Sequence, residues 1–269
     1  MTSSDRPLLS GSATAEGTAA YAARQSERVA PGHFRQVQGL IVSSIGLGSY
    51  LGEPDAEDDG RYREAAREAL RLGCNFIDTA INYRFQRSER ALGEAIAAAV
   101  GAGEVRREEI VVASKGGYVP FDGAPPRDPA RYFADTFVRP GVARPEDLVA
   151  GCHCMTPAYI EHQLNASRRN LGLECLDIYY LHNPEQQLDE VEPAELLVRL
   201  RAAFERLEEL ADAGRLCFYG TATWNGYRSG PGASGHLDLA EIVQAARQVA
   251  GDRHRFRFVQ APLNLAMTK

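Results

Sequence analysis

Residues 73–100, GCNFIDTAINYRFQRSERALGEAIAAAV, combine a short apolar strand with a helix and carry two polar residues between them. The strand is predicted over 75–77 and runs directly into Asp78, and Tyr83 follows on the loop. The helix is predicted from apolar residues spaced along one face: Leu92, Ala95, Ile96, Ala99 and Val100. A carboxylate and a phenol at such a junction suit proton transfer, although an isolated Asp there more often caps a turn or a helix.

The alternation of strands and helices continues on both sides of this stretch. Further strands are predicted over 42–47, 110–114, 176–181, 216–220 and from Phe258, after a short hairpin over 34–41. Further helices are predicted over 58–72, 156–171, 193–214 and 237–250. Short, nearly all-apolar strands separated by helices indicate parallel pairing through βαβ crossovers. Six strands suffice for a doubly wound sheet, whereas a closed (β/α)₈ barrel needs eight.

The composition limits the classes of function. The chain has 269 residues, a formal charge of −6 and no basic run interleaved with aromatic residues, which argues against nucleic-acid binding. No apolar run approaches the ~20 residues of a membrane span, and the N-terminus lacks the pattern of a signal peptide. Five scattered cysteines, an odd number, fit reduced thiols better than a disulfide framework. We therefore expect a cytoplasmic protein with no membrane or nucleic-acid partner.

Two segments lack a regular pattern. Residues 1–34 are rich in small and polar residues, so we expect a disordered or loosely packed segment before one barrel domain over 35–269. Residues 116–155 form a long predicted loop that contains several aromatic residues. Loops of that length inside a compact domain are usually functional, and we expect this one to help roof a substrate site.

Polar residues follow three consecutive predicted strands. Asp78 and Tyr83 follow the second strand, Lys115 the third and His182 the fourth. Because the C-terminal ends of parallel barrel strands share one rim, we expect the four side chains to meet there. A lysine ammonium would lower the pKa of a nearby phenol, an aspartate would hold the lysine in place, and a histidine could orient a carbonyl oxygen. The set suits protonation of a carbonyl oxygen as a hydride reaches its carbon.

Several motifs resemble those of the aldo-keto reductases, which are NAD(P)H-dependent (β/α)₈ barrels. The motifs span about 42–265 and are GLGSYLGE, FIDTAINY, ASKGG, LDIYYLHNPE, LCFYG and VQAPLNL. The resemblance implies that the chain reduces an aldehyde or ketone to an alcohol. It implies Tyr83 as the general acid, His182 as the group that orients the carbonyl, and Lys115 with Asp78 as the pair that tunes the tyrosine.

The resemblance also implies a nicotinamide cofactor, NADPH with NADH as the alternative. Gln260 would contact the nicotinamide carboxamide, although a polar residue that merely lines the barrel fits that position equally well. The family's Ser-Asn pair after the fifth strand is replaced by Thr221-Ala222-Thr223-Trp224-Asn225, in which Asn225 could stand in for one member.

The chain departs from the family at its C-terminal end, because no candidate for a seventh or eighth strand follows Leu265. We therefore expect a (β/α)₈ barrel truncated after about six β/α units, without the loops that grip the cofactor's phosphates. Open strand edges would result, and a complementary chain could complete the barrel.

Three alternatives remain open at this stage. The chain could be a catalytically silent binding or regulatory module, or an inactive fragment, built on the reductase scaffold. It could also be an isomerase or lyase that uses Lys115 as a Schiff-base amine. Cys152-His153-Cys154 looks like a metal cluster, but no second pair lies at ligand spacing, so loop residues or buried thiols are favoured.

Overall fold

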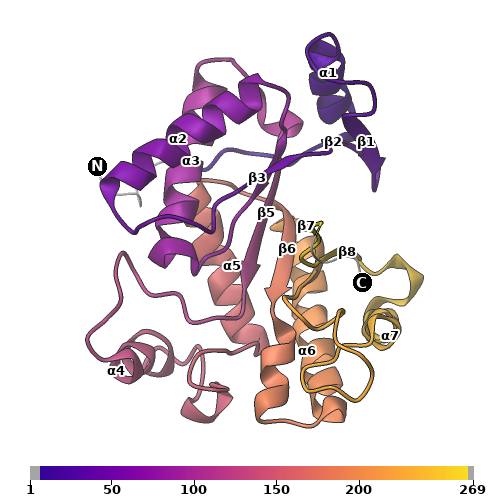
Figure 1. Ribbon diagram of the computed structural model, residues 1–269. Coiled ribbons are helices and arrows are strands. Elements are labelled where there is room, and N and C mark those ends of the chain that lie inside the picture. Colours follow the sequence, from indigo (N-terminus) through magenta and orange to yellow (C-terminus); the bar gives the residue numbers. More distant parts are fainter. Residues whose placement is uncertain (1–6, 266–269) are drawn as a thin grey trace. The chain divides into compact units, whose positions relative to one another are not determined.

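The computed structural model describes residues 7–265 (Figure 1). The chain divides into two compact units. Unit 1 lies within Met1–Ser114, Pro120–Pro125 and Asn165–Ile178. Unit 2 lies within Lys115–Val119, Pro126–Leu164 and Tyr179–Lys269. The predicted single domain over 35–269 stays a prediction, and residues 1–6 and 266–269 lie outside the described part.

Six strands form one sheet in the order β3-β4-β5-β6-β7-β8, as the sequence predicts. Their bounds are Gly46–Gly48, Phe76–Asp78, Val111–Gly116, Leu176–His182, Leu216–Ala222 and Phe256–Gln260. In unit 1, β4 pairs in parallel with both β3 and β5, and Asp78 lies opposite Gly48 and Ala113. In unit 2, β7 pairs in parallel with β8, and Ala222 lies opposite Gln260.

The predicted helices are present within a few residues of their expected ends. They are α2 (Ala56–Arg71), α3 (Arg87–Gly101), α5 (Pro157–Leu171), α6 (Pro193–Asp212) and α7 (Leu239–Ala250). Local chemistry fixes their starts: Asp55 accepts a hydrogen bond from the Asp58 amide of α2, and Asp238 accepts one from the Ala240 amide of α7. After α2 the chain reverses at Gly73, whose φ of +100° disfavours a side chain.

The N-terminal segment contains a packed helix, so the prediction of a loose segment is wrong for α1 (Ala15–Gln25). Thr14 caps α1, and both Thr18 and Tyr21 are fully buried. The Tyr21 hydroxyl donates to the carbonyl of Leu70 in α2. The order of α1 therefore depends on contacts with a helix about fifty residues away, which composition alone does not reveal.

The predicted hairpin forms, but the first core strand is shorter than expected. Strands β1 (Phe34–Val37) and β2 (Leu40–Ser43) pair in antiparallel fashion as a separate two-stranded sheet. Residues 42–47 therefore do not form one strand, because β2 ends at Ser43 and β3 begins at Gly46. The Asn75 side chain accepts from the Ser43 amide and donates to the Ile41 and Glu109 carbonyls, which ties the hairpin to the start of β4.

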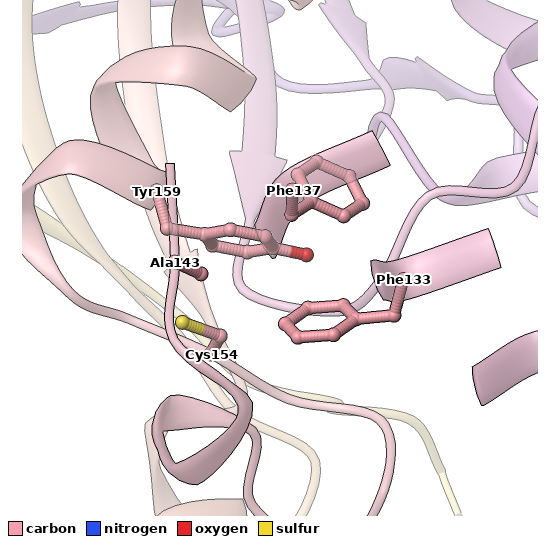
Figure 2. Packing of buried hydrophobic residues seen from close by; sticks show 5 residues of the cluster. All are labelled: Phe133, Phe137, Ala143, Cys154 and Tyr159. Carbon is pink, nitrogen blue, oxygen red and sulfur yellow. The ribbon is translucent and has the colours of Figure 1, made fainter. Parts of the chain in front are cut away.

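The long loop of 116–155 builds a hydrophobic cluster within unit 2 (Figure 2). Its helix α4 (Pro129–Phe133) continues into a π-helix over Ala134–Val138. The cluster consists of Phe133, Phe137, Ala143, Cys154 and Tyr159 of α5, all buried. The rings of Phe137 and Tyr159 lie 5.0 Å apart between centroids. Phe133 and Phe137 thus pack in this cluster, and the predicted role of the loop as a roof over substrate stays a prediction.

Candidate active site

Asp78 and Tyr83 lie at the end of β4 and on the loop that follows it, in unit 1. Asp78 is the last residue of β4, and both side chains are partly exposed. Burial raises the pKa of Tyr83 above its usual value, and the neighbouring Asp78 carboxylate and Tyr50 raise it further. The rings of Tyr50 and Tyr83 meet edge to face at 5.1 Å between centroids. Burial, Asp78 and Tyr50 therefore all favour the protonated phenol.

The backbone after Tyr83 is strained. Arg84, Phe85 and Gln86 have φ values of 47°, 56° and 70°, a left-handed run without glycine or asparagine. The buried Arg84 guanidinium holds the run in place by donating to the Glu53 carbonyl at 2.8 Å and to Asp59 Oδ1 at 2.8 Å. Such strain persists only where surrounding contacts impose it, and it concentrates at functional sites. No local sequence signal pointed to Arg84.

Lys115 and His182 lie at the ends of β5 and β6, in unit 2. Lys115 is 1% exposed, and His182 is the last residue of β6. Burial, together with the charges of Lys115 and His153, lowers the pKa of His182 to about 3. The imidazole is therefore neutral near pH 7 and can donate an N–H without carrying a charge. Asn183 follows it with a φ of 46°, a second left-handed residue directly after a candidate catalytic group.

Two aromatic side chains that the sequence analysis did not assign surround His182. The Tyr118 ring contacts both His153 and His182 edge to face, with centroids 5.2 Å apart in each case. The Tyr118 hydroxyl accepts from Asn183 Nδ2 at 3.1 Å. His153 Nε2 lies 2.8 Å from the carbonyl oxygen of His182. The Cys-His-Cys stretch thus supplies a structural partner to His182.

The residues described in 7–265 contain no group of three or more His, Cys, Asp and Glu side chains that could hold a metal ion. All five cysteines are free thiols.

Gln260 and Asn225 belong to the ends of adjacent strands of unit 2: Gln260 ends β8, and Asn225 lies on the loop after β7. Gln260 is the last residue of β8, and its carbonyl accepts from the Thr223 amide at the start of the loop that carries Asn225. Glu185 holds this loop, because its Oε1 accepts from the Thr223 hydroxyl and from the amides of Trp224 and Asn225. Glu185 was not singled out from the sequence.

This region fits the carboxamide end of a nicotinamide. Glu185 Oε2 is buried and has no hydrogen-bond partner among the described residues. An unsatisfied carboxylate oxygen is costly and suits an amide N–H₂ donor. The amide side chains of Asn225 and Gln260 belong to the same unit and offer both donors and acceptors. The residues present are therefore compatible with the group that the sequence resemblance implies.

Comparison with known proteins gives a family match over most of the chain. The model of the aldo/keto reductase family matches residues 44–228. An aldo-keto reductase family 1 member C23-like protein of Equus caballus is 27% identical over 196 residues, which cover 70% of this chain and 49% of that protein. A prostaglandin-E(2) 9-reductase of Oryctolagus cuniculus is 26% identical with the same coverage. The chain spans about half the length of these curated relatives.

Solved structures show the same fold. A glycerol dehydrogenase from Gluconobacter oxydans aligns with a TM-score of 0.54 and 22% identity, over 88% of this chain and 57% of that one. An aldo-keto reductase from Bombyx mori in complex with NADP aligns with a TM-score of 0.54 and 19% identity, over 88% of this chain and 60% of that one. The six β/α strands thus correspond to part of a (β/α)₈ barrel, which confirms the predicted fold class. The assembly of Asp78, Tyr83, Lys115 and His182 into one site stays a prediction.

Proposed function

Because the chain belongs to the aldo/keto reductase family, we propose that it is an NAD(P)H-dependent oxidoreductase that reduces an aldehyde or ketone to an alcohol. One observation carries the proposal: Asp78, Lys115 and His182 each lie at the C-terminal end of a successive strand, and Tyr83 lies on the adjoining loop. Barrel enzymes place their chemistry at these strand ends. When bound, the reduced nicotinamide supplies the hydride.

Tyr83 holds the proton at its Oη and gives it to the carbonyl oxygen of the substrate. Burial and Asp78 raise the pKa of Tyr83, so a compensating positive charge is needed before the phenol becomes an effective acid. The proposal assigns that charge to Lys115. Asp78 would keep this lysine charged and in position.

His182 donates an N–H to the same carbonyl oxygen and orients it. Its low pKa of about 3 makes it a neutral donor, so it stabilises developing negative charge without competing with Tyr83 as the acid. Asn225 and Gln260 would hold the nicotinamide carboxamide, with Glu185 Oε2 as a further acceptor. We favour NADPH because NADP is bound in the related Bombyx mori structure, and NADH remains the alternative cofactor.

The proposal includes a small carbonyl substrate and a partner that completes the barrel. Because the chain spans about half the length of its relatives, two further β/α units would come from another segment or a complementary chain. We also propose a cytoplasmic location, which the free state of all five cysteines supports. In the part of the chain that the structure describes, no helix is long and apolar enough to cross a membrane.

The test measures cofactor binding and turnover separately. The chain is titrated with NADPH and with NADH by nicotinamide fluorescence, first alone and then with a second chain that supplies the two further β/α units. The reduction of benzaldehyde is followed by the loss of absorbance of the reduced nicotinamide. Tyr83→Phe should reduce kcat by about a thousandfold at unchanged cofactor affinity, since general-acid catalysis contributes about 10²–10⁴-fold. Tyr50→Phe is the matched control, because Tyr50 packs against Tyr83 and has no assigned proton role.

Each outcome separates one hypothesis from another. Cofactor binding without turnover, even with the complementary half present, would favour a silent binding module over an enzyme. Equal turnover by Tyr83→Phe and wild type would remove Tyr83 as the acid. Trapping of a carbonyl compound on Lys115 by borohydride would instead indicate Schiff-base chemistry.

A further inference from the structure

His153 connects the end of β6 to α6 through a chain of buried and partly buried hydrogen bonds, all within unit 2. His153 Nε2 lies 2.8 Å from the His182 carbonyl oxygen, and His153 Nδ1 lies 2.8 Å from Gln187 Nε2. Gln187 Oε1 in turn accepts from Arg199 Nη1 at 2.6 Å. His153 and Gln187 are each 1% exposed. Burying two polar side chains is costly unless they are hydrogen-bonded, and here both ring nitrogens of His153 and both polar atoms of the Gln187 amide have a partner.

The polarity of this chain of hydrogen bonds is set at both ends, because the His182 carbonyl can only accept and the Arg199 guanidinium can only donate. Arg199 can only donate, so it fixes the amide oxygen of Gln187 toward α6 and the amide N–H₂ toward His153. His153 Nδ1 must then accept, and the single proton of the neutral ring must lie on Nε2, where it donates to the His182 carbonyl. Arg199 is itself held by Glu195, whose Oε1 accepts from Arg199 Nε at 3.0 Å.

The surroundings pack closely around the His153 ring. Gly117 approaches the ring so closely that a Cβ there would lie 2.5 Å from His153 Nε2 and 3.0 Å from the His182 carbonyl oxygen. The Tyr118 ring packs against both histidines. The amide of Cys154 donates to the Gly117 carbonyl at 2.9 Å, so the backbone after β5 and the backbone around His153 are also joined.

We propose that His153 is a positioning residue for His182: with its proton required on Nε2 by the His182 carbonyl, and with Gln187 donating to Nδ1, it holds the His182 carbonyl and thereby the direction of the imidazole. The catalytic part of this inference rests on the proposed function, because it assumes that His182 orients the carbonyl substrate. The left-handed turn at Asn183 directly after His182 is consistent with such support, since this backbone conformation persists only where surrounding contacts favour it.

The first test determines the tautomer of His153 by NMR on the full chain labelled with ¹⁵N-histidine. His153 should carry its proton on Nε2, with an unprotonated Nδ1, and the resonances are assigned by their loss in His153→Gln. Arg199→Met should leave the proton on Nε2, because the His182 carbonyl can only accept, but should shift the Nδ1 resonance, because the Gln187 amide is then free to turn away from Nδ1. Arg201→Met is the matched control, since Arg201 lies on the same helix and bonds Gln248 instead.

The second test compares two replacements of His153. Glutamine can place an N–H near the position of Nε2, whereas asparagine reaches only the position of Nδ1 and leaves the His182 carbonyl without its donor. His153→Asn should lower kcat about tenfold more than His153→Gln, at unchanged KM for NADPH.

The outcomes distinguish this inference from the proposed function. A proton on Nδ1 of His153, or identical histidine spectra for Arg199→Met and Arg201→Met, would overturn the hydrogen-bond chain. Equal kcat values for the two His153 variants would overturn the positioning role. A wild-type chain that never turns over a carbonyl compound would overturn the proposed function and the positioning role together, whereas the tautomer measurement would still decide the hydrogen-bond chain.

Discussion

Lowering the pH from 7.5 to 5.0 should destabilise the protein by about 2 kcal/mol through His153 alone. Burial lowers the pKa of His153 from 6.5 to about 4, and the hydrogen bond to the His182 carbonyl opposes only part of that shift. At pH 5 the unfolded chain binds a proton at His153 nearly completely, whereas the folded chain does not. The pH range follows from the sign of the shift. Because the folded pKa is the lower one, this stability is fully present above pH 6.5 and is lost as the pH falls toward 4. With about 1.36 kcal/mol per pH unit between the two pKa values, the loss at pH 5 is about 2 kcal/mol.

The assay is urea unfolding of wild type and His153→Gln at both pH values, followed by circular dichroism. The variant has no titrating group at this position, so its free energy of unfolding should fall by about 2 kcal/mol less than that of wild type over the same pH interval. Cys152→Ala, a change at the neighbouring residue, should behave as wild type does. The same pH-dependent loss in wild type and in His153→Gln would refute the assignment of this proton to His153.

Three further changes test other parts of the structure. Tyr21→Ala should destabilise the protein by about 3–5 kcal/mol in urea unfolding, because it empties a fully buried site between α1 and α2; a change near zero would mean that α1 is not packed. Arg84→Lys should lower kcat about tenfold without weakening NADPH binding, because lysine cannot make both contacts that hold the left-handed residues after Tyr83. Unchanged kcat and KM values would show that these residues do not position Tyr83. Glu185→Ala should weaken NADPH binding about tenfold in a fluorescence titration, because alanine removes the oxygen that accepts from the loop at Thr223. Glu185→Gln keeps an acceptor oxygen and should bind NADPH much as wild type does. Equal affinities of the two variants for NADPH would contradict this role of Glu185.

The sequence was sufficient to predict the helices and strands whose apolar residues recur at regular spacing within the element itself. Helix α6 is an example, because Leu196, Leu200, Phe204 and Leu207 mark its buried face at helical spacing. Helix α1 was missed because its buried residues are mainly small or polar, and because the partner of Tyr21 lies in α2. Composition therefore suggested disorder where a distant contact imposes order.

The candidate site was predicted only in part, for a related physical reason. Asp78, Lys115 and His182 could be identified because each directly follows an apolar strand. Arg84 and His153 could not, because their roles depend on backbone conformation and hydrogen bonds to residues distant in the sequence. In the sequence, His153 between two cysteines suggested only a metal ligand or a buried neighbour of thiols.

The central claim is that this chain, with its barrel complete, transfers a hydride from a reduced nicotinamide to a carbonyl carbon. The most direct measurement uses NADPH that carries deuterium at C4 of the nicotinamide, with benzaldehyde as the substrate and mass spectrometry of the alcohol formed. Our account predicts one deuterium on the carbinol carbon with wild type and Tyr50→Phe, and about a thousandfold slower incorporation with Tyr83→Phe. Two results would contradict our account. One is alcohol without deuterium, whichever face of the nicotinamide C4 carries the label. The other is no alcohol at all while NADPH is bound.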